Sequence, residues 1–198
     1  MLPVIETFYS LQGEGYFAGS AAFFIRLAGC PVQCDFCDEQ NSWSIDEDSK
    51  VDVEDIVGEV VESGAKCVVV TGGEPIIHRL QLLTNLLRSY GIRTHLETSG
   101  YGGTLTGTWD WITFSPKKIF KPSPEFYQKA NELKIVIEDT NDFDFAEYHH
   151  SLSVPDTKFY LQPEWSNRDE IIPMIIEYIK LHPQWRLSLQ IHKYLDIS

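Results

Sequence analysis

The chain has 198 residues, 43% of them hydrophobic and 13% aromatic, so it can bury a sizeable core but is too short for a complete eight-fold β/α barrel of about 250 residues. Its formal net charge of −13 argues against broad binding of a nucleic-acid backbone, because a protein that binds phosphates along a strand needs a basic face. No apolar run reaches the roughly 20 residues of a membrane span, and the N-terminal MLPVIETFYS lacks the layout of a signal peptide. We therefore expect one soluble, cytoplasmic domain over residues 1–198, with no direct nucleic-acid or membrane partner.

Short apolar runs alternate with amphipathic stretches along the chain. The apolar runs predict strands within residues 22–28, 66–73, 93–100, 110–117, 132–139, 158–164 and 185–193. The amphipathic stretches predict helices over residues 53–63, 80–91 and 169–182, the first capped by Asp52 and ended by Gly64. Strands that alternate with helices form βαβ units and a parallel sheet. Roughly six such units fit, which predicts an α/β fold: a partial, shortened barrel that lacks some units of the complete one.

Polar residues follow several of these strands at the point where each strand is expected to end. Such groups occur at residues 71–75 (TGGEP), 97–100 (ETSG), 115–117 (SPK) and 162–163 (QP). In parallel α/β sheets the working residues lie at the carboxyl ends of the strands. We therefore expect the functional site at this end of the sheet.

Three of the four cysteines, Cys30, Cys34 and Cys37, form a C-x3-C-x2-C pattern directly after the first of these strands. Clustered cysteines in a reducing compartment more often bind metal than form disulfides. A structural zinc site would need a fourth ligand, and no histidine has paired zinc-finger spacing. An iron–sulfur cube on three thiolates keeps one iron open for a substrate or cofactor. The fourth cysteine, Cys67, lies within CVVV and is expected in the core as a small hydrophobe.

The C-x3-C-x2-C loop and the later TGGEP turn together are similar to the radical S-adenosylmethionine superfamily. The resemblance implies a [4Fe-4S] cluster on Cys30, Cys34 and Cys37, with S-adenosylmethionine chelating the open iron. Electron transfer from the cluster would then generate a 5′-deoxyadenosyl radical. In the turn, two glycines allow close backbone approach to such a ligand, and Glu74 can meet its ammonium group. Taken alone, TGGEP is equally compatible with an ordinary strand-to-helix turn.

A closer resemblance covers nearly the whole chain and rests on SLQGEGYFAG (residues 10–19), FIRLAGC (24–30) and SLQIHKYL (188–195), with LKIV and LQPE between them. These motifs resemble the 7-carboxy-7-deazaguanine synthase family. The resemblance implies a lyase of 7-deazapurine (queuosine-type) biosynthesis. It would convert 6-carboxy-5,6,7,8-tetrahydropterin to 7-carboxy-7-deazaguanine with release of ammonia, taking hydrogen from C6 of the pterin and later returning it. It also implies magnesium, an external electron donor of the flavodoxin or ferredoxin type, and a homodimer of six-stranded, shortened barrels.

The resemblance assigns residues to the two ligands. The cofactor residues are Gly73 and Glu74 at the methionine end of S-adenosylmethionine, and Ser99, Ser115, Lys117, Gln162 and Pro163 around its adenosine side. The substrate residues are Leu11, Gln12, Gly13, Glu14, Arg26, Thr71, His192 and the terminal carboxylate of Ser198. An amide, a carboxylate and backbone groups suit the alternating donors and acceptors of a pterin edge. A guanidinium can pair with the substrate carboxylate in a fork.

Without the resemblance, several of these residues have simpler explanations. Gln12 and Glu14 fit a solvated, glycine-rich turn, Lys117 fits plain surface, and His192 fits a surface histidine near the end of the chain. Arg26 differs, because a charge inside an apolar strand requires a partner or an anionic ligand.

The chain departs from the family pattern after the last cysteine. The family usually continues with Asp and then a Thr or Ser that helps to bind magnesium, whereas here Asp38 and Glu39 follow Cys37. Because a carboxylate is a good ligand for magnesium, we expect Glu39 to contact the metal in an altered geometry.

Two other functions stay open on the sequence. A glycyl-radical activase would share the cysteine loop and TGGEP but would act on a protein partner, and SLQGEG and LQ-x-HKY argue against it. A non-catalytic zinc-binding module would contain zinc without iron or sulfide.

Overall fold

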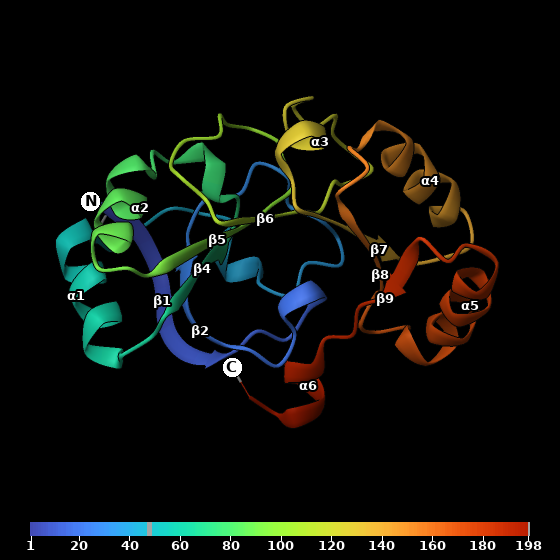
Figure 1. The fold of residues 1–198 in the computed structure, drawn as a ribbon, viewed down its shortest axis with the longest axis horizontal. Coiled ribbons are helices and arrows are strands. Elements are labelled where there is room, and N and C mark those ends of the chain that lie inside the picture. Colours follow the sequence, from blue (N-terminus) through green and yellow to red (C-terminus); the bar gives the residue numbers. More distant parts are fainter. Residues whose placement is uncertain (47–48, 198) are drawn as a thin grey trace.

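The computed structural model describes residues 1–46 and 49–197. Within them, nine strands form one sheet in the order β3-β1-β2-β4-β5-β6-β7-β8-β9 (Figure 1). The strands from β2 to β9 that neighbour one another are parallel, whereas β1 is antiparallel to both β2 and β3. The sheet curves but stays open, because β3 and β9 form its two edges. This confirms the predicted partial barrel with a parallel sheet.

The strands are β1 (Leu2–Leu11), β2 (Ala21–Leu27), β3 (Lys50–Val51), β4 (Cys67–Gly72), β5 (Arg93–Thr98), β6 (Trp111–Phe114), β7 (Glu132–Ile137), β8 (Lys158–Pro163) and β9 (Trp185–Leu187). The α-helices are α1 (Val53–Ser63), α2 (Gln81–Ser89), α3 (Phe126–Lys129), α4 (Asp142–Leu152), α5 (Arg168–Leu181) and α6 (Ile191–Leu195). The short 3-10 helices η1 (Gly15–Phe17), η2 (Gln40–Ser42) and η4 (Pro75–Ile77) lie in loops near the ends of β1, β2 and β4.

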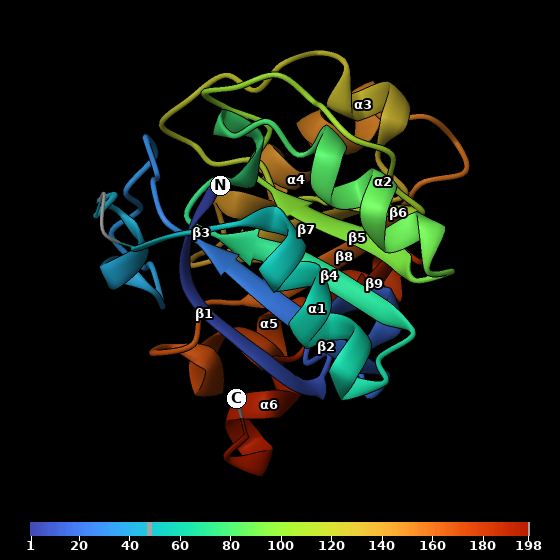
Figure 2. The ribbon, with the colours of Figure 1, turned by 90° about the vertical axis from the view of Figure 1, so that its left-hand side faces the viewer.

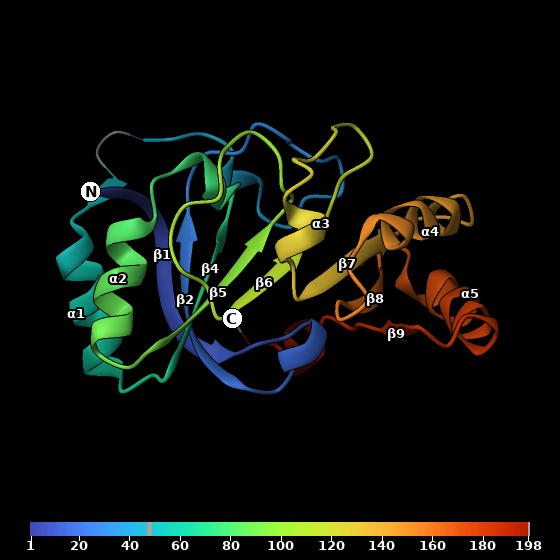
Figure 3. The same ribbon diagram turned by 45° about the horizontal axis from the view of Figure 1, so that its top comes forward.

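Helices cover the outer face of the curved sheet (Figures 2 and 3), with α1 against α2 at one end and α4 and α5 at the other. Side chains alternate between the two faces of each strand. In β2, Phe23, Ile25 and Leu27 join the hydrophobic core beneath the helices, while Arg26 faces the interior of the barrel. In β7, Lys134 faces the same interior. The alternation therefore leaves room for charged side chains inside the barrel.

The local predictions differ from the structure at the two ends of the chain and at the helices α3 and α4 between them. The helix Val53–Ser63 is confirmed, with Asp52 at its N-cap and Gly64 at its C-cap in the left-handed region (φ 73°). The strand predicted over residues 185–193 is wrong beyond Leu187, where β9 ends. There the chain leaves the sheet and forms α6, because the Ile191 N–H donates to the Gly13 carbonyl (2.9 Å) near the end of β1. Strand β1 itself and the helices α3, α4 and α6 were not predicted.

Cys67 is 4% exposed and packs with Ala22, Phe24 and Val69 in a small apolar cluster on the inner face of β2 and β4. This confirms its predicted place in the core. Burial raises the pKa of its thiol to about 11. Among the described residues, no helix combines the length and the hydropathy needed to cross a bilayer.

Candidate active site

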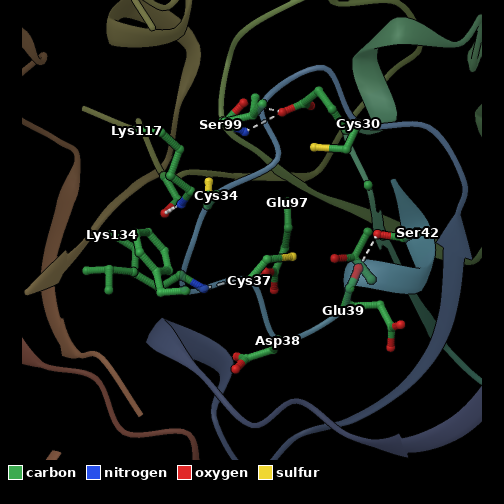
Figure 4. A pocket seen from close by; sticks show the side chains of 18 of the residues that line it. Cys30, Cys34, Cys37, Asp38, Glu39, Ser42, Glu97, Ser99, Lys117 and Lys134 are labelled. Carbon is green, nitrogen blue, oxygen red and sulfur yellow. Dashed lines mark hydrogen bonds and ion pairs between the residues drawn. The ribbon is translucent and has the colours of Figure 1, made fainter. Parts of the chain in front are cut away.

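Two adjoining cavities lie at the carboxyl ends of the parallel strands, as the sequence predicted for the functional site. The first, the cysteine cavity, has a volume of about 240 Å³ and is lined by all three clustered cysteines (Figure 4). The second, the β1 cavity, has a volume of about 280 Å³ and lies between the end of β1 and the C-terminal segment. The residues lining both cavities include Glu14, Arg26, Glu39, Thr71, Glu97 and Gln190. These shared walls make the two cavities parts of one site.

The cysteine loop follows β2 and is pinned to the segment after η2. Gly29 N–H donates to the Ser42 carbonyl (2.7 Å) and Cys30 N–H to the Trp43 carbonyl (3.1 Å). The Trp43 indole N–H donates to the sulfur of Cys37 (3.4 Å), a contact that tunes an iron–sulfur thiolate in electron-transfer proteins. All three thiols are free and partly exposed.

The donor set fits an iron–sulfur cube. Figure 4 shows the sulfur atoms of Cys30, Cys34 and Cys37 around one open region of the cysteine cavity. A cube binds each thiolate to a different iron, so three separated thiols suit it. Burial raises the pKa of Cys34, and the nearby ammonium of Lys117 opposes this rise. Lys117 thereby favours the thiolate that a metal requires.

Glu74 is a buried carboxylate, 2% exposed, at the edge of the cysteine cavity. Its Oε2 accepts from the Ser99 N–H (2.7 Å) and the Ser99 hydroxyl, and its Oε1 accepts from the Thr98 hydroxyl. Burial raises the pKa of Glu74, and these hydrogen bonds oppose the rise. The predicted contact of Glu74 with an ammonium group stays a prediction, and the buried carboxylate has the chemistry for it.

The glycines of the TGGEP turn have a structural reason that the sequence did not reveal. A Cβ on Gly73 would lie 2.2 Å from the Gly29 carbonyl oxygen, and the Glu74 N–H donates to that same oxygen (2.8 Å). A Cβ on Gly72 would lie 2.2 Å from the Leu27 carbonyl oxygen. The close approach that these glycines allow is therefore to the cysteine loop itself.

The other cofactor residues of the prediction also line the cysteine cavity, namely Ser99, Ser115, Lys117, Gln162 and Pro163. Lys117 Nζ donates to the Ser115 hydroxyl (2.7 Å) and lies 5.9 Å from the centre of the Phe36 ring. Burial lowers the pKa of Lys117. Lys117 is thus turned into the site and is not the surface lysine of the alternative reading.

The predicted substrate residues Leu11, Gln12, Gly13, Glu14, Arg26, Thr71 and His192 all line the β1 cavity. Gln12 Nε2 donates to Glu97 Oε1 (2.8 Å), and Gln12 Oε1 accepts from the Glu14 N–H (3.1 Å). His192 packs directly on Gly13, where a Cβ would lie 1.9 Å from its Nδ1. The predicted substrate residue Ser198 lies outside the residues that the structure describes.

Glu14 is bound on both oxygens. Its Oε2 contacts the ammonium of Lys134, and its Oε1 accepts from Gln190 Nε2 (2.8 Å). Burial opposes ionisation of Glu14, but Lys134 outweighs it and lowers the pKa to about 2. Gln12 and Glu14 are therefore ordered side chains inside the site, not members of a solvated turn.

Arg26 has protein partners that the sequence did not identify. Its Nε lies 2.7 Å from Glu6 Oε1 on the neighbouring strand β1 and 3.9 Å from Glu39 Oε2. The expected contact of Glu39 with magnesium stays a prediction. Within residues 1–46 and 49–197, no three Cys, His, Asp or Glu side chains are grouped to hold a single ion.

The sequence assigned no ligand to several charged and amide side chains of the site, namely Asp38, Glu97, Lys134 and Gln190. Asp38 accepts from Gln190 Nε2 (2.9 Å) and pairs with Lys193 Nζ (2.7 Å), so it ties the cysteine loop to α6. Lys134 carried a readable signal, because it is a charge inside the apolar run LKIV, as Arg26 is inside FFIRLA. Gln190 carried none, because it was assigned to a continuing strand.

Comparison with known proteins identifies the family. The profile of the Radical SAM superfamily matches residues 24–114, which include the cysteine loop and TGGEP. The chain is 48% identical to the 7-carboxy-7-deazaguanine synthase of Synechocystis sp., over 98% of this chain and 93% of the relative. It is 36% identical to the 7-carboxy-7-deazaguanine synthase of Escherichia coli K12, over 99% of both chains. The crystal structure of QueE from Escherichia coli superposes with a TM-score of 0.81 at 34% identity, covering 95% of this chain and 93% of that one.

These likenesses extend over the full chain and include the N-terminal and C-terminal motifs that distinguish the synthases from other radical enzymes. They favour the synthase over the glycyl-radical activase and the zinc-binding module. The chain belongs to the 7-carboxy-7-deazaguanine synthase family of the radical S-adenosylmethionine superfamily.

Proposed function

We propose that this protein converts 6-carboxy-5,6,7,8-tetrahydropterin to 7-carboxy-7-deazaguanine and ammonia. The substrate loses only ammonia, so the conversion has no net oxidation or reduction. The observation that carries the proposal is the continuity of the two cavities through Thr71, Glu97 and Glu14. A ligand among the cysteines and Glu74 would lie against a ligand among Gln12, Glu14 and His192.

The cofactor would occupy the cysteine cavity. Cys30, Cys34 and Cys37 would hold the [4Fe-4S] cluster, and Glu74 would receive the ammonium group of S-adenosylmethionine. When bound, the two supply a radical that takes hydrogen from the substrate. The chain's own part is to keep Glu74 in place through Thr98 and Ser99.

The pterin would occupy the β1 cavity. Glu14 and Glu97 present carboxylate oxygens and Gln12 presents its amide, which matches the donors and acceptors of the pyrimidine edge. Arg26 would pair with the substrate carboxylate through the guanidinium nitrogens other than Nε, which Glu6 already occupies. Charge-assisted contacts of this kind fix orientation, which is what a hydrogen abstraction at one carbon requires.

Further elements of the proposal come from the family. Glu39 would contact magnesium at the border of the two cavities, and the carboxylate of Ser198 would close the β1 cavity. The cluster would receive its electron from a flavodoxin or ferredoxin. The enzyme would act in the cytoplasm as a homodimer.

An anaerobic assay tests the proposal. The protein is reconstituted with iron and sulfide and then supplied with S-adenosylmethionine, dithionite, magnesium and 6-carboxytetrahydropterin, and products are identified by mass spectrometry. We expect 7-carboxy-7-deazaguanine, and we expect none from Cys34→Ser, which removes one cluster ligand. Accumulation of 5′-deoxyadenosine without the deazaguanine, in a preparation shown to carry the cluster, would refute the substrate assignment.

A further inference from the structure

Lys134 is a buried cation to which the proposed function gives no task. It lies on β7, is 5% exposed, and its ammonium contacts Glu14 and lies 3.5 Å from Glu97 Oε2. Glu14 comes from the loop after β1 and Glu97 from β5, so Lys134 joins three strands that are not neighbours in the sheet. An ammonium offers three donors and no acceptor, so it can hold two carboxylates together.

The two carboxylates held by Lys134 hold amides in turn. Glu97 Oε1 accepts from Gln12 Nε2 (2.8 Å), and Glu14 Oε1 accepts from Gln190 Nε2 (2.8 Å). Every polar group of this set lines the β1 cavity or the wall that it shares with the cysteine cavity. The position of Lys134 therefore determines how the recognition groups face the cavity.

A second residue of β7 supports the same loop. Glu132 lies two positions before Lys134 and accepts from the Tyr16 N–H (3.2 Å) and the Trp111 indole N–H (3.1 Å). The backbone at Gly15 is so close that a Cβ there would lie 1.9 Å from Glu132 Oε1. Two successive inward side chains of β7 thus contact the loop that carries Gln12 and Glu14.

We propose that Lys134 is a positioning residue for substrate recognition, which holds the carboxylates of Glu14 and Glu97 oriented to accept the N–H donors of the pterin. The proposal rests on the proposed function, because it takes the pterin as the ligand of the β1 cavity. The geometric basis is a contact of one cation with two carboxylates. Among the described residues, Glu14 and Glu97 are the only carboxylates that line the β1 cavity, the cysteine cavity and a third, small cavity inside the barrel.

Removal of the ammonium has a predictable electrostatic result. Glu14 is buried, and burial alone raises its pKa; Lys134 reverses this effect. The other charged groups that face the pair are Glu97 from β5, Glu132 from β7, His192 from α6 and Lys117 beyond β6. Of these, only His192 and Lys117 can carry a positive charge. The ammonium of Lys134 hydrogen-bonds directly to Glu14, whereas His192 and Lys117 act on it from a distance.

In Lys134→Met, burial of Glu14 is no longer offset by the ammonium, so we expect its pKa to rise and its protonated fraction to increase toward low pH. A protonated carboxyl loses acceptor capacity toward the substrate and regains it when the pH rises. We expect the dissociation constant of the pterin to increase about ten- to one-hundred-fold at pH 7, the effect of losing one charged hydrogen bond. At each pH the pterin affinity of Lys134→Met is divided by that of the wild type. We expect this ratio to increase toward one as the pH rises. In the wild type, Lys134 keeps Glu14 ionised across this range.

The experiment measures equilibrium binding, not turnover. Cluster-loaded protein with S-adenosylmethionine and no reductant is titrated anaerobically with 6-carboxytetrahydropterin between pH 6 and pH 9. The wild type, Lys134→Met, Lys134→Arg and Lys129→Met are compared. Lys129 pairs with Glu125 on the exposed face of α3, so it is a matched control with the same substitution far from the site. Iron content and S-adenosylmethionine affinity are measured in each variant.

The proposal predicts weak, pH-dependent pterin binding by Lys134→Met, with iron content and S-adenosylmethionine affinity as in the wild type. Lys134→Arg keeps the charge and should show a flat profile relative to the wild type, which preserves the test if Lys134→Met fails to fold. A pH-independent loss in Lys134→Met, or a pH-dependent ratio in Lys134→Arg, would overturn the positioning role. Wild-type protein that binds S-adenosylmethionine but not the pterin would instead overturn the proposed function.

Discussion

Replacing Gly73 by alanine tests whether the TGGEP turn is glycine-rich in order to seat the cysteine loop. The added Cβ would lie 2.2 Å from the Gly29 carbonyl oxygen. Close carbon–oxygen contacts in proteins are about 3.3 Å, so the turn and the loop must separate by about 1 Å. Both partners are backbone, so no side chain can rotate away. Gly73 is not in the left-handed region, so the effect is steric and not conformational.

The separation has a cost that can be estimated. Overpacking costs about 1–3 kcal/mol, and the Glu74 N–H to Gly29 carbonyl hydrogen bond (2.8 Å) is worth about 1 kcal/mol. We therefore expect Gly73→Ala to lower the free energy of unfolding by about 2–4 kcal/mol in urea titrations. We also expect it to reduce the iron bound after reconstitution, because Cys30 follows the displaced Gly29.

A matched glycine provides the control. Gly58 lies inside α1, and a Cβ there would meet nothing within 4 Å. Gly58→Ala should raise the free energy of unfolding by about 0.5–1 kcal/mol, because alanine is the better helix former. A neutral surface substitution changes the free energy of unfolding by no more than about 0.5 kcal/mol. If Gly73→Ala stayed within that limit of the wild type and bound the same amount of iron, the steric explanation would be wrong.

Three further variants test other contacts of the site. Trp43→Phe removes the N–H donor to the Cys37 sulfur (3.4 Å) and should make the reduction potential of the cluster more negative, as an EPR-monitored redox titration would show; an unchanged potential would contradict it. Glu39→Gln should weaken magnesium binding and so raise the magnesium concentration needed for half-maximal activity. An unchanged magnesium dependence of activity would show that Glu39 is not a metal ligand. Burial raises the pKa of Glu132 from 4.5 to about 7, so the folded state loses stability relative to the unfolded state as the pH rises from 4.5 to 7. This pH-dependent loss of unfolding free energy, on the order of 3 kcal/mol, should be absent from Glu132→Gln. Urea titrations at pH 5 and pH 8 would show it as a difference between the two pH values that is smaller in the variant than in the wild type.

The parallel strands could be predicted because they are apolar on both faces over most of their length. Apolar runs such as CVVV between two turns clearly indicate buried strands. The polar groups at their carboxyl ends line the cysteine cavity. Strand β1 could not be predicted in the same way. It contains the charged Glu6 and a register shift between Val4 and Glu6, which break the alternation that identifies a strand.

The partners of the charged residues could not be predicted, because they depend on pairings between distant parts of the chain. Lys134 and Glu14 are 120 positions apart, and Gln190 and Glu14 are 176 apart. The pattern showed that Arg26 needed a partner but did not identify Glu6 on β1. The end of β9 was missed for the same reason, since the hydrogen bond from Ile191 to Gly13 is a contact between the two ends of the chain.

We propose that S-adenosylmethionine and the pterin occupy one continuous site and exchange a hydrogen there. The most direct measurement uses pterin labelled with deuterium at C6 and counts product formed against S-adenosylmethionine consumed. We predict 7-carboxy-7-deazaguanine in excess over the S-adenosylmethionine consumed, with deuterium passing into the S-adenosylmethionine pool. Consumption of one S-adenosylmethionine for each product formed, with no deuterium in the recovered S-adenosylmethionine, would contradict the claim.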